Sequence, residues 1–373
     1  MIKILLLIDY SSEFDRKLLR GLVQYSKENG PWLFYRLPSY YSAMHGEQGI
    51  LKWAKEWKAD AIIGQWNNDT IDLQKELNIP VVLQNYHHRS VTYSNLTGDY
   101  KGTGRMAAQF FAKRMFRNFA YFGVKGVVWS DERCEGYRQE VKRIGGEFFS
   151  FESDKQEDEI RMEVSQWLQQ LPKPVALFCC DDAHALFISE TCKMTNIPIP
   201  EEIALLGVDN DELMCNISDP PISSIELEVE RGGYSIGRLI HQQIKKEHEG
   251  TFNIVINPIR IELRQSTEKH NIKDPYILEV VKYIESHYSS DLTIESLLAN
   301  IPLSRRNFEV KFKNALNTSI YQYILNCRCN HLADLLLTTD RPLADLAMEV
   351  GFTDYNNICL LYTSDAADDR ISV

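Results

Sequence analysis

The sequence lacks the features of membrane and exported proteins. No apolar run approaches the roughly 20 residues that a membrane-spanning helix needs. The apolar run at the N-terminus ends at Asp9, which makes it too short for a signal peptide. None of the eight cysteines forms a CxxC pair, so we expect reduced thiols rather than a disulfide framework. We therefore predict a cytoplasmic protein that is not associated with a membrane.

The chain also lacks an excess of basic residues. Lys and Arg number 41 and Asp and Glu number 52, which gives a formal net charge of −11. A protein that binds nucleic acid over its whole surface would be basic, so any such binding must be confined to a local region. The 44% of apolar residues indicates a folded globular chain. Its 373 residues exceed one ordinary domain, and we expect two or three.

The sequence has no complete motif for catalysis, a metal or a nucleotide cofactor. Gly102-Thr103-Gly104 begins a predicted helix, but position 107 is alanine where a phosphate-binding GxGxxG loop has its third glycine. His87-His88 has no second ligand pair four residues away. Asp181-Asp182 has only His184 nearby as a base, and no nucleophile elbow or HExxH motif is present. We predict no catalytic residue, no metal site and no cofactor. The alternative to a protein without catalytic function is an enzyme that acts on sugars, and an assay for turnover of pentoses would reveal it.

Residues 3–264 alternate short apolar runs with longer amphipathic stretches. Ile4–Ile8 and Val175–Cys179 have the composition of buried strands, whereas Phe14–Glu28 has its apolar residues at helical spacing. This alternation predicts an α/β fold with doubly wound parallel sheets that are covered on both faces. The pattern pauses and restarts, so we predict two lobes with a cleft between them, the chain crossing near residue 95 and again near residues 210–230.

Carboxylates, amides and aromatic residues follow the predicted strands, and ligands of parallel sheets bind at the carboxyl ends of the strands. Such side chains suit a neutral polyol, because they hydrogen-bond hydroxyl pairs and cover the C–H face of a sugar ring. Each residue could equally be an ordinary helix cap or turn residue, so the prediction depends on their convergence. Trp129 is an alternative stacking residue. The predicted sugar-binding residues are Asp9, Tyr10, Phe14, Trp66, Asn85, Arg133, Asp181 and Asp209.

Three segments of this region resemble motifs of LacI/GalR-type effector domains. They are Ile203–Glu212, which contains Gly-Val-Asp-Asn, Asp131–Tyr137, which contains RxxGY, and Gly98–Gly102. The resemblance spans roughly residues 1–265 and implies the periplasmic sugar-binding fold. It also implies that Arg133 and Asp209 contact the sugar, because they occupy the motif positions that do so in that family.

After Glu268 the pattern becomes helical. Residues 269–274 form a polar linker, and Pro275 begins a helix with apolar residues at three- and four-residue spacing. An internal repeat follows at an offset of 49, in which Ile294–Ile301 is matched by Leu343–Val350. Each copy is a short helix with one apolar face, followed by a turn and a new N-cap candidate. We therefore predict two helix-turn-helix units.

The second helix of the first unit has a polar and basic outer face opposite an apolar stripe of Phe308, Phe312 and Leu316. Residues 304–314 carry four basic residues against Glu309, a local charge of +3 in an acidic chain. In the major groove Arg can contact guanine and Asn adenine. A merely solvated helix face is the alternative, which the tandem arrangement disfavours. The predicted DNA-binding residues are Ser304, Arg305, Arg306, Asn307, Val310 and Lys313 in the first unit and Thr353, Tyr355 and Asn356 in the second.

Residues 275–359 resemble the AraC-type DNA-binding domain, through LTIESLLANIPLSRRNFEVKFKNALNTS, PLADLAMEVGFTDYNNI and a long connecting helix over Thr318–Thr339. A LacI-type effector domain (residues 1–268) joined to an AraC domain resembles the family of bacterial xylose-operon regulators. The resemblance implies D-xylose as the effector, double-stranded operator DNA as the partner, and a homodimer that activates transcription, with RNA polymerase as a further partner. The residues alone leave open which sugar binds and whether the outcome is activation or repression.

Residues 360–373 depart from the AraC pattern. The closing motif and the final helix of that family are missing, and Asp365, Asp368 and Asp369 outnumber Arg370. Their local charge of −2 would repel DNA phosphates. We expect these residues to be foreign to the domain, which is then truncated. The alternative function is therefore a cytoplasmic sugar-binding protein with a damaged, non-functional DNA-binding domain.

Overall fold

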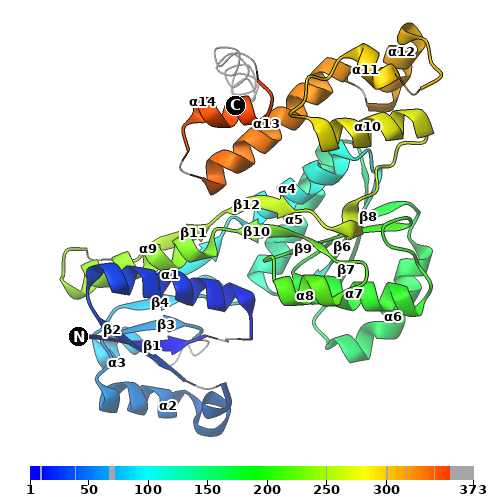
Figure 1. Cartoon of the computed structure of the whole chain (residues 1–373). Helices are drawn as coiled ribbons and strands as arrows, with labels where there is room; N and C mark the ends of the chain where they lie inside the picture. The colour runs from blue at the N-terminus through cyan, green and yellow to red at the C-terminus, as the bar shows by residue number, and fades with distance from the viewer. Residues whose placement is uncertain are drawn as a thin grey trace. The chain divides into compact units, whose positions relative to one another are not determined.

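The computed structural model describes residues 1–8, 11–37, 39–66, 72–248, 250–299, 301–316, 318–339 and 341–352 (Figure 1). The chain divides into two compact units between Lys269 and His270. Among the described helices, none is both long and apolar enough to span a bilayer.

The first unit contains two six-stranded sheets, and each forms the centre of one lobe. The sheet of lobe 1 has the order β11-β5-β4-β3-β1-β2, and its pairs are parallel. Its strands are β1 (Ile2–Leu7), β2 (Trp32–Arg36), β3 (Ala61–Gly64), β4 (Val81–Leu83), β5 (Ser94–Gly98) and β11 (Asn253–Ile256). Helices α1 (Glu13–Asn29) and α9 (Val229–Ile244) pack on one face, and α2 (Ser39–Trp57, kinked at Gly46) and α3 (Leu73–Leu77) belong to the other. Successive side chains of β1 point to opposite faces of the sheet, as in any strand. Ile4 enters the hydrophobic cluster on one face and Leu5 the cluster on the other, so the strand is covered on both faces.

The sheet of lobe 2 has the order β12-β10-β9-β8-β6-β7 and is parallel except for the pair β10–β12. Its strands are β6 (Asn118–Val124), β7 (Glu147–Ser153), β8 (Val175–Cys179), β9 (Ile203–Val208), β10 (Ser223–Leu227) and β12 (Pro258–Glu262). Its helices are α4 (Tyr100–Lys113), α5 (Val128–Arg143), α6 (Glu157–Gln170), α7 (Asp182–Met194) and α8 (Glu212–Ile217). The predicted class, α/β with doubly wound parallel sheets, is confirmed.

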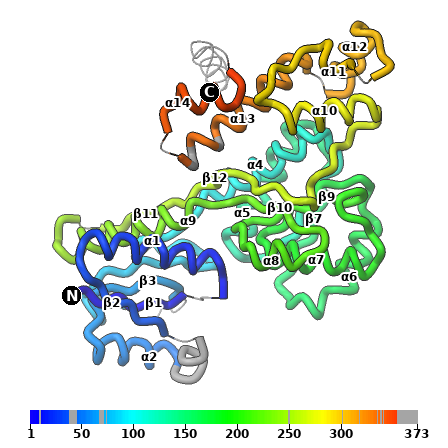
Figure 2. Tube along the Cα trace, in the orientation of Figure 1, coloured from blue at the N-terminus to red at the C-terminus, as the bar shows by residue number. Residues whose placement is uncertain are grey.

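The chain passes from one sheet to the other after β5, after β10 and after β11, and Figure 2 follows these passages by colour. The sequence predicts two crossings, and the structure has a third because β11 is a single short strand at the edge of the first sheet. In the sequence, β11 comes between α9 and β12. Among the described strands, it hydrogen-bonds only to β5.

Each lobe has one pair of helices whose backbones approach closely through glycine. A Cβ built on Gly21 of α1 would lie 1.9 Å from the carbonyl oxygen of Glu230, and one on Gly233 of α9 would lie 2.1 Å from that of Leu18. In lobe 2, a Cβ on Gly104 of α4 would lie 2.1 Å from the carbonyl oxygen of Arg133 on α5. Only glycine permits these contacts, since real Cβ atoms do not come so near to a backbone oxygen.

The second unit is helical, and its described helices are α10 (Pro275–His287), α11 (Ile294–Leu298), α12 (Arg305–Leu316), α13 (Ile320–Thr338) and α14 (Leu343–Glu349). Asp274 caps α10 by accepting from the backbone N–H groups of Tyr276 and Ile277. Thr293 and Ser296 form a capping box at α11. The predicted stripe of Phe308, Phe312 and Leu316 is buried.

Candidate functional site

Arg133 lies inside α5, about one and a half turns after its first residue. Its residue is 3% exposed, and its guanidinium Nη1 donates to the carbonyl oxygen of Cys180, the first residue after β8. The rings of Tyr100 and Trp129 lie 5.6 and 5.5 Å from its guanidinium carbon. Strands β6 and β8 flank the point where the strand order of the sheet reverses, which is where ligands of open α/β sheets bind.

Asp209 follows β9 in a tight turn with positive φ at two successive residues, 98° at Asp209 and 49° at Asn210. Aspartate and asparagine tolerate this backbone region better than other side chains do. The turn is held by the carboxylate of Asp182, which accepts from the Asp211 N–H at 2.7 Å. It is held also by Ser224 Oγ, which accepts from the Asn210 N–H at 3.0 Å. These bonds fix the backbone of the turn from which the Asp209 side chain projects.

Arg133 and Asp209 converge, as the sequence predicts, but leave hydrogen-bonding capacity unused. Arg133 Nη2 lies 3.6 Å from Asp209 Oδ1, which is an ion pair beyond normal hydrogen-bond length. Within the described part of the chain, Arg133 Nε and Asp209 Oδ1 are buried atoms without a hydrogen-bond partner. Burial raises the pKa of Asp209, although the charge of Arg133 opposes the shift. A buried donor beside a buried acceptor is suited to a ligand that carries hydroxyl groups.

The pair Asp181-Asp182 divides into two roles. Asp181 caps α7 by accepting from the His184 N–H at 2.8 Å, and the same oxygen, Oδ1, contacts His184 Nδ1 at 2.7 Å. Burial acts to raise the pKa of Asp181, but His184 outweighs it and the net shift is downward. Asp182 is fully engaged by Ser224 and by the Asp211 N–H, and burial raises its pKa well above the usual value. Asp182 is therefore a support for the turn of Asp209.

The aromatic and amide residues predicted in lobe 1 are spread out. Trp66 and Asn85 line a hollow of about 350 Å³ with Asp72, Arg89 and Tyr93 among others, and Asn85 Oδ1 accepts from the Trp66 N–H at 3.1 Å. Arg89 of this hollow forms a bidentate pair with Glu132 of α5, at 2.6 and 2.8 Å. Phe14 packs against the core cluster of α1. Asp9 and Tyr10 lie outside the described residues.

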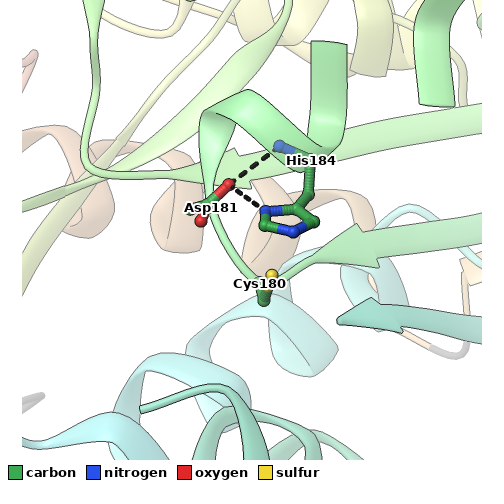
Figure 3. A group of neighbouring side chains, drawn as sticks. All are labelled: Cys180, Asp181 and His184. Atoms are coloured by element: carbon green, nitrogen blue, oxygen red, sulfur yellow. Dashed lines mark hydrogen bonds and ion pairs between the residues drawn. The ribbon is translucent and has the colours of Figure 1, made fainter. Parts of the chain in front are cut away.

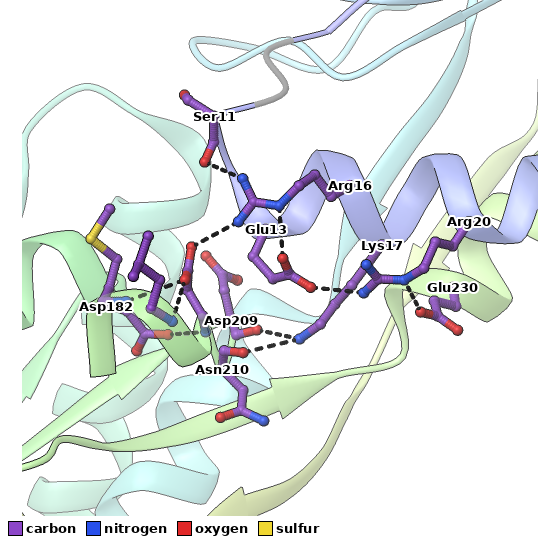
Figure 4. Close-up of polar contacts among 12 residues, drawn as sticks. Ser11, Glu13, Arg16, Lys17, Arg20, Asp182, Asp209, Asn210 and Glu230 are labelled. Carbon is purple, nitrogen blue, oxygen red and sulfur yellow. Dashed lines mark hydrogen bonds and ion pairs between the residues drawn. The ribbon is translucent and has the colours of Figure 1, made fainter. Parts of the chain in front are cut away.

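Sequence reasoning missed a set of contacts that join the two lobes. Lys17 of α1 in lobe 1 donates from Nζ to the carbonyl oxygens of Asp209 at 2.7 Å and Asn210 at 3.3 Å (Figure 4). Its neighbour Arg16 lies 3.4 Å from the carboxylate of Asp211. Lys17 is only 9% exposed although it is a lysine near a helix start, and burial of this kind has no signal in a single sequence. Lobe 1 therefore contacts the same turn that aims Asp209.

Helix α12 presents the predicted polar face. Ser304 precedes the helix and accepts from the Asn307 N–H, and Arg306, Asn307, Val310 and Lys313 are exposed, Val310 by 51%. Arg305 is exposed too, but its guanidinium contacts Glu295 at 3.0 Å and Glu309 at 3.1 Å. Lys311 turns away from this face to pair with Asp274 at 2.6 Å. Thr353, Tyr355, Asn356 and residues 360–373 lie outside the described residues.

Comparisons with known proteins match both units. A periplasmic binding protein-like domain model matches residues 108–267, and a helix-turn-helix domain model matches residues 297–363. The xylose operon regulatory protein of Escherichia coli K12 is 23% identical over 363 residues, which are 94% of this chain and 91% of the relative. That of Haemophilus influenzae is 24% identical over 364 residues, covering 94% and 92%. The chain is a two-domain transcription regulator.

Solved structures share the fold of this regulator. The structure of the xylose-binding transcription activator xylR superposes with a TM-score of 0.61 at 21% identity, covering 97% of this chain and 95% of that one. The complex of the transcriptional regulator CelR with cellobiose has a TM-score of 0.59 at 18% identity, covering 71% and 84%. The relatives are regulators rather than enzymes, which agrees with the prediction that the chain has no catalytic function.

Proposed function

We propose that the regulator binds a monosaccharide, D-xylose, between its lobes and binds operator DNA through its helix-turn-helix units as a homodimer, activating transcription with RNA polymerase. The observation that carries the sugar proposal is the buried pair of Arg133 Nε and Asp209 Oδ1, which have no hydrogen-bond partner in the described chain. A neutral polyhydroxylated ligand offers both a donor and an acceptor to such a pair. The two xylose operon regulatory proteins support the choice of D-xylose.

Calorimetric titration of the full chain tests the sugar proposal. We expect D-xylose to bind more tightly than L-arabinose, D-ribose or D-glucose. Tighter binding of another of these sugars would contradict the specificity, and binding of none of them would contradict the ligand class.

The contacts of Lys17 suggest how sugar binding reaches the rest of the protein. A sugar that hydrogen-bonds the Asp209 carboxylate contacts the same turn whose backbone carbonyls accept from Lys17, so ligand contact and lobe contact favour each other. Replacing Lys17 by methionine keeps most of its buried stem but removes the charged donor. We expect sugar affinity to fall about 10-fold, since hydrogen bonds to charged groups contribute roughly 1.5–3 kcal/mol.

Calorimetry measures this loss, and small-angle scattering with saturating sugar should show a larger radius of gyration in K17M. The control is Lys27→Met, an exposed lysine on the last turn of the same helix, which we expect to bind sugar as the parent does. Equal affinities for the two variants would contradict the coupling role of Lys17.

DNA binding is proposed for the exposed face of α12. The helix begins at a capped end with Arg306 and Asn307 exposed in its first turn, as base-edge recognition in the major groove requires. Duplexes selected from a random library by the full chain, with and without D-xylose, test this step. Selection of a defined sequence is the expected result. Sugar binding without selection of any sequence would favour the alternative of an inactive DNA-binding domain.

Arg305 and Arg306 should affect DNA binding differently. Arg306→Ala should cost about 1–3 kcal/mol on the selected duplex and relax the preference at one base position, because an exposed arginine can read a base edge. Arg305 is already paired with Glu295 and Glu309, so it is not free to read a base, and Arg305→Ala leaves two glutamates unpaired near the DNA. Arg305→Ala should therefore weaken binding evenly across sequences and keep the base preference. Fluorescence anisotropy at several salt concentrations measures both effects. An unchanged sequence preference in R306A would contradict base reading by this residue.

A further inference from the structure

Three side chains of different types meet where β8 ends and α7 begins. The sulfur of Cys180, a carboxylate oxygen of Asp181 and a ring nitrogen of His184 all lie within 4.8 Å of one another (Figure 3). The sequence predicts no metal site and overlooks this group, because its signal is a Cys-Asp-x-x-His run rather than a familiar ligand motif.

The local fold holds these donors in place without an ion. The Cys180 N–H donates to the carbonyl oxygen of Phe122 at 2.9 Å and extends the sheet by one residue. Asp181 then caps α7, and His184 follows one turn later, its ring 5.9 Å from that of Phe122. Both bonds that Asp181 accepts from His184 use Oδ1, so Oδ2 can serve as a ligand while the cap stays intact.

The spacing of the donors is close to that of a zinc site. With zinc–ligand bonds of about 2.0–2.3 Å, the ligand atoms of a tetrahedral ion lie roughly 3.3–3.6 Å apart. The candidate donor atoms lie within 4.8 Å of one another, so no separation would have to shorten by more than about 1.5 Å. Sulfur, imidazole nitrogen and carboxylate oxygen are all zinc ligands.

Charge and access also permit an ion. A thiolate and a carboxylate would balance its two positive charges. The nearby guanidinium of Arg133 is itself paired with Asp209 at 3.6 Å. Cys180 is fully buried, but the side chains of His184 and Asp181 are 21% and 19% exposed, which leaves a path for entry.

We propose that Cys180, Asp181 and His184 bind a divalent cation of the zinc class, with the fourth coordination position open. Three protein ligands and one exchangeable position differ from closed structural sites, which have four protein ligands. The proposal does not depend on the identity of the sugar, because the test measures binding of the ion itself.

Titration of the metal-free, reduced full chain with Co²⁺, an analogue of Zn²⁺ with visible absorption, tests the proposal. We expect one equivalent to produce the d–d bands of a tetrahedral ion and a thiolate-to-cobalt charge-transfer band, and Zn²⁺ to abolish both. Cys180→Ser should remove the charge-transfer band. Cys192→Ser, which alters another buried cysteine on α7, should keep it. His184→Gln should weaken Co²⁺ binding at least about 10-fold.

If the other variants fold poorly, Asp181→Asn still tests the proposal. Asparagine is as good an N-cap residue as aspartate, so we expect this variant to fold. We expect it to weaken Co²⁺ binding while the far-ultraviolet circular dichroism stays that of the parent. Absence of a charge-transfer band in the parent chain would overturn the proposal. An undiminished band in C180S would overturn it as well, since the thiolate would then come from another cysteine.

Discussion

Replacing Asp209 by asparagine is expected to lower the affinity for the sugar about 100-fold, or ~2.7 kcal/mol. The buried Oδ1 of Asp209 has no partner in the described chain and faces Arg133, so a sugar hydroxyl that donates to it gains a charge-assisted hydrogen bond. Asparagine tests the carboxylate more specifically than alanine does. The φ of this residue is 98°, which asparagine tolerates, whereas alanine would add backbone strain to the loss of the carboxylate. Calorimetry on the full chain measures the loss.

The fold should survive this change. Burial raises the pKa of Asp209, so the folded state holds a proton on it more tightly than the unfolded state does. Its charged form therefore costs stability above its unfolded pKa, and the neutral amide of asparagine does not carry this cost. Without sugar, D209N should therefore unfold at the same temperature as the parent or at a higher one. The control is Asp158→Asn, an exposed aspartate in the first turn of α6, which should bind sugar normally. A parent-like affinity in D209N would refute its role as a ligand contact.

Replacing Gly233 by alanine is expected to destabilise the first unit by about 3 kcal/mol. The new methyl would lie 2.1 Å from the carbonyl oxygen of Leu18, an atom of the α1 backbone that cannot rotate away. Helices α1 and α9 would have to separate, although alanine regains up to about 1 kcal/mol of helix propensity. All six tryptophans lie in the first unit, so denaturation followed by their fluorescence reports on this unit alone.

The neighbouring glycine supplies a matched control. The three atoms nearest to a Cβ on Gly232 all belong to side chains, two of Ile256 at 2.9 and 3.0 Å and one of Leu96 at 3.9 Å, and side chains can adjust. We expect G232A to stay within about 1 kcal/mol of the parent. If the two variants lost equal stability, the cause would be glycine loss in α9 generally and not the approach of its backbone to α1.

The two variants separate the roles of two parts of the first unit. Asp209 lies in a turn that touches both the proposed ligand position and Lys17 of the opposite lobe, so its substitution should affect binding and closure but not folding. Gly233 lies far along the chain in a helix pair within one lobe, so its substitution should affect folding first. Sugar affinity measured on folded G233A, below its unfolding temperature, is expected to be closer to that of the parent than to that of D209N.

The sequence by itself determined the elements whose apolar pattern is strong and local. Val175–Cys179 is a strand with the bounds that its composition predicts. A short, fully apolar run between two helices is typical of a parallel strand that is buried on both faces. The stripe of α12 is equally local, since residues three and four apart on a helix share a face. The match of these patterns to known families extended the prediction to the order of the two domains.

Only the tertiary structure decided the elements and contacts that depend on distant residues. Strand β10 begins with two buried serines, which no apolar pattern predicts; they are stable there because Ser266 and Thr267 hydrogen-bond one and Asp182 the other. Lys17 is buried because it meets carbonyl oxygens 192 and 193 positions away. A single sequence records which side chains are available but not which will be neighbours, because a polar group becomes stable in the interior only when its partner arrives from another part of the chain.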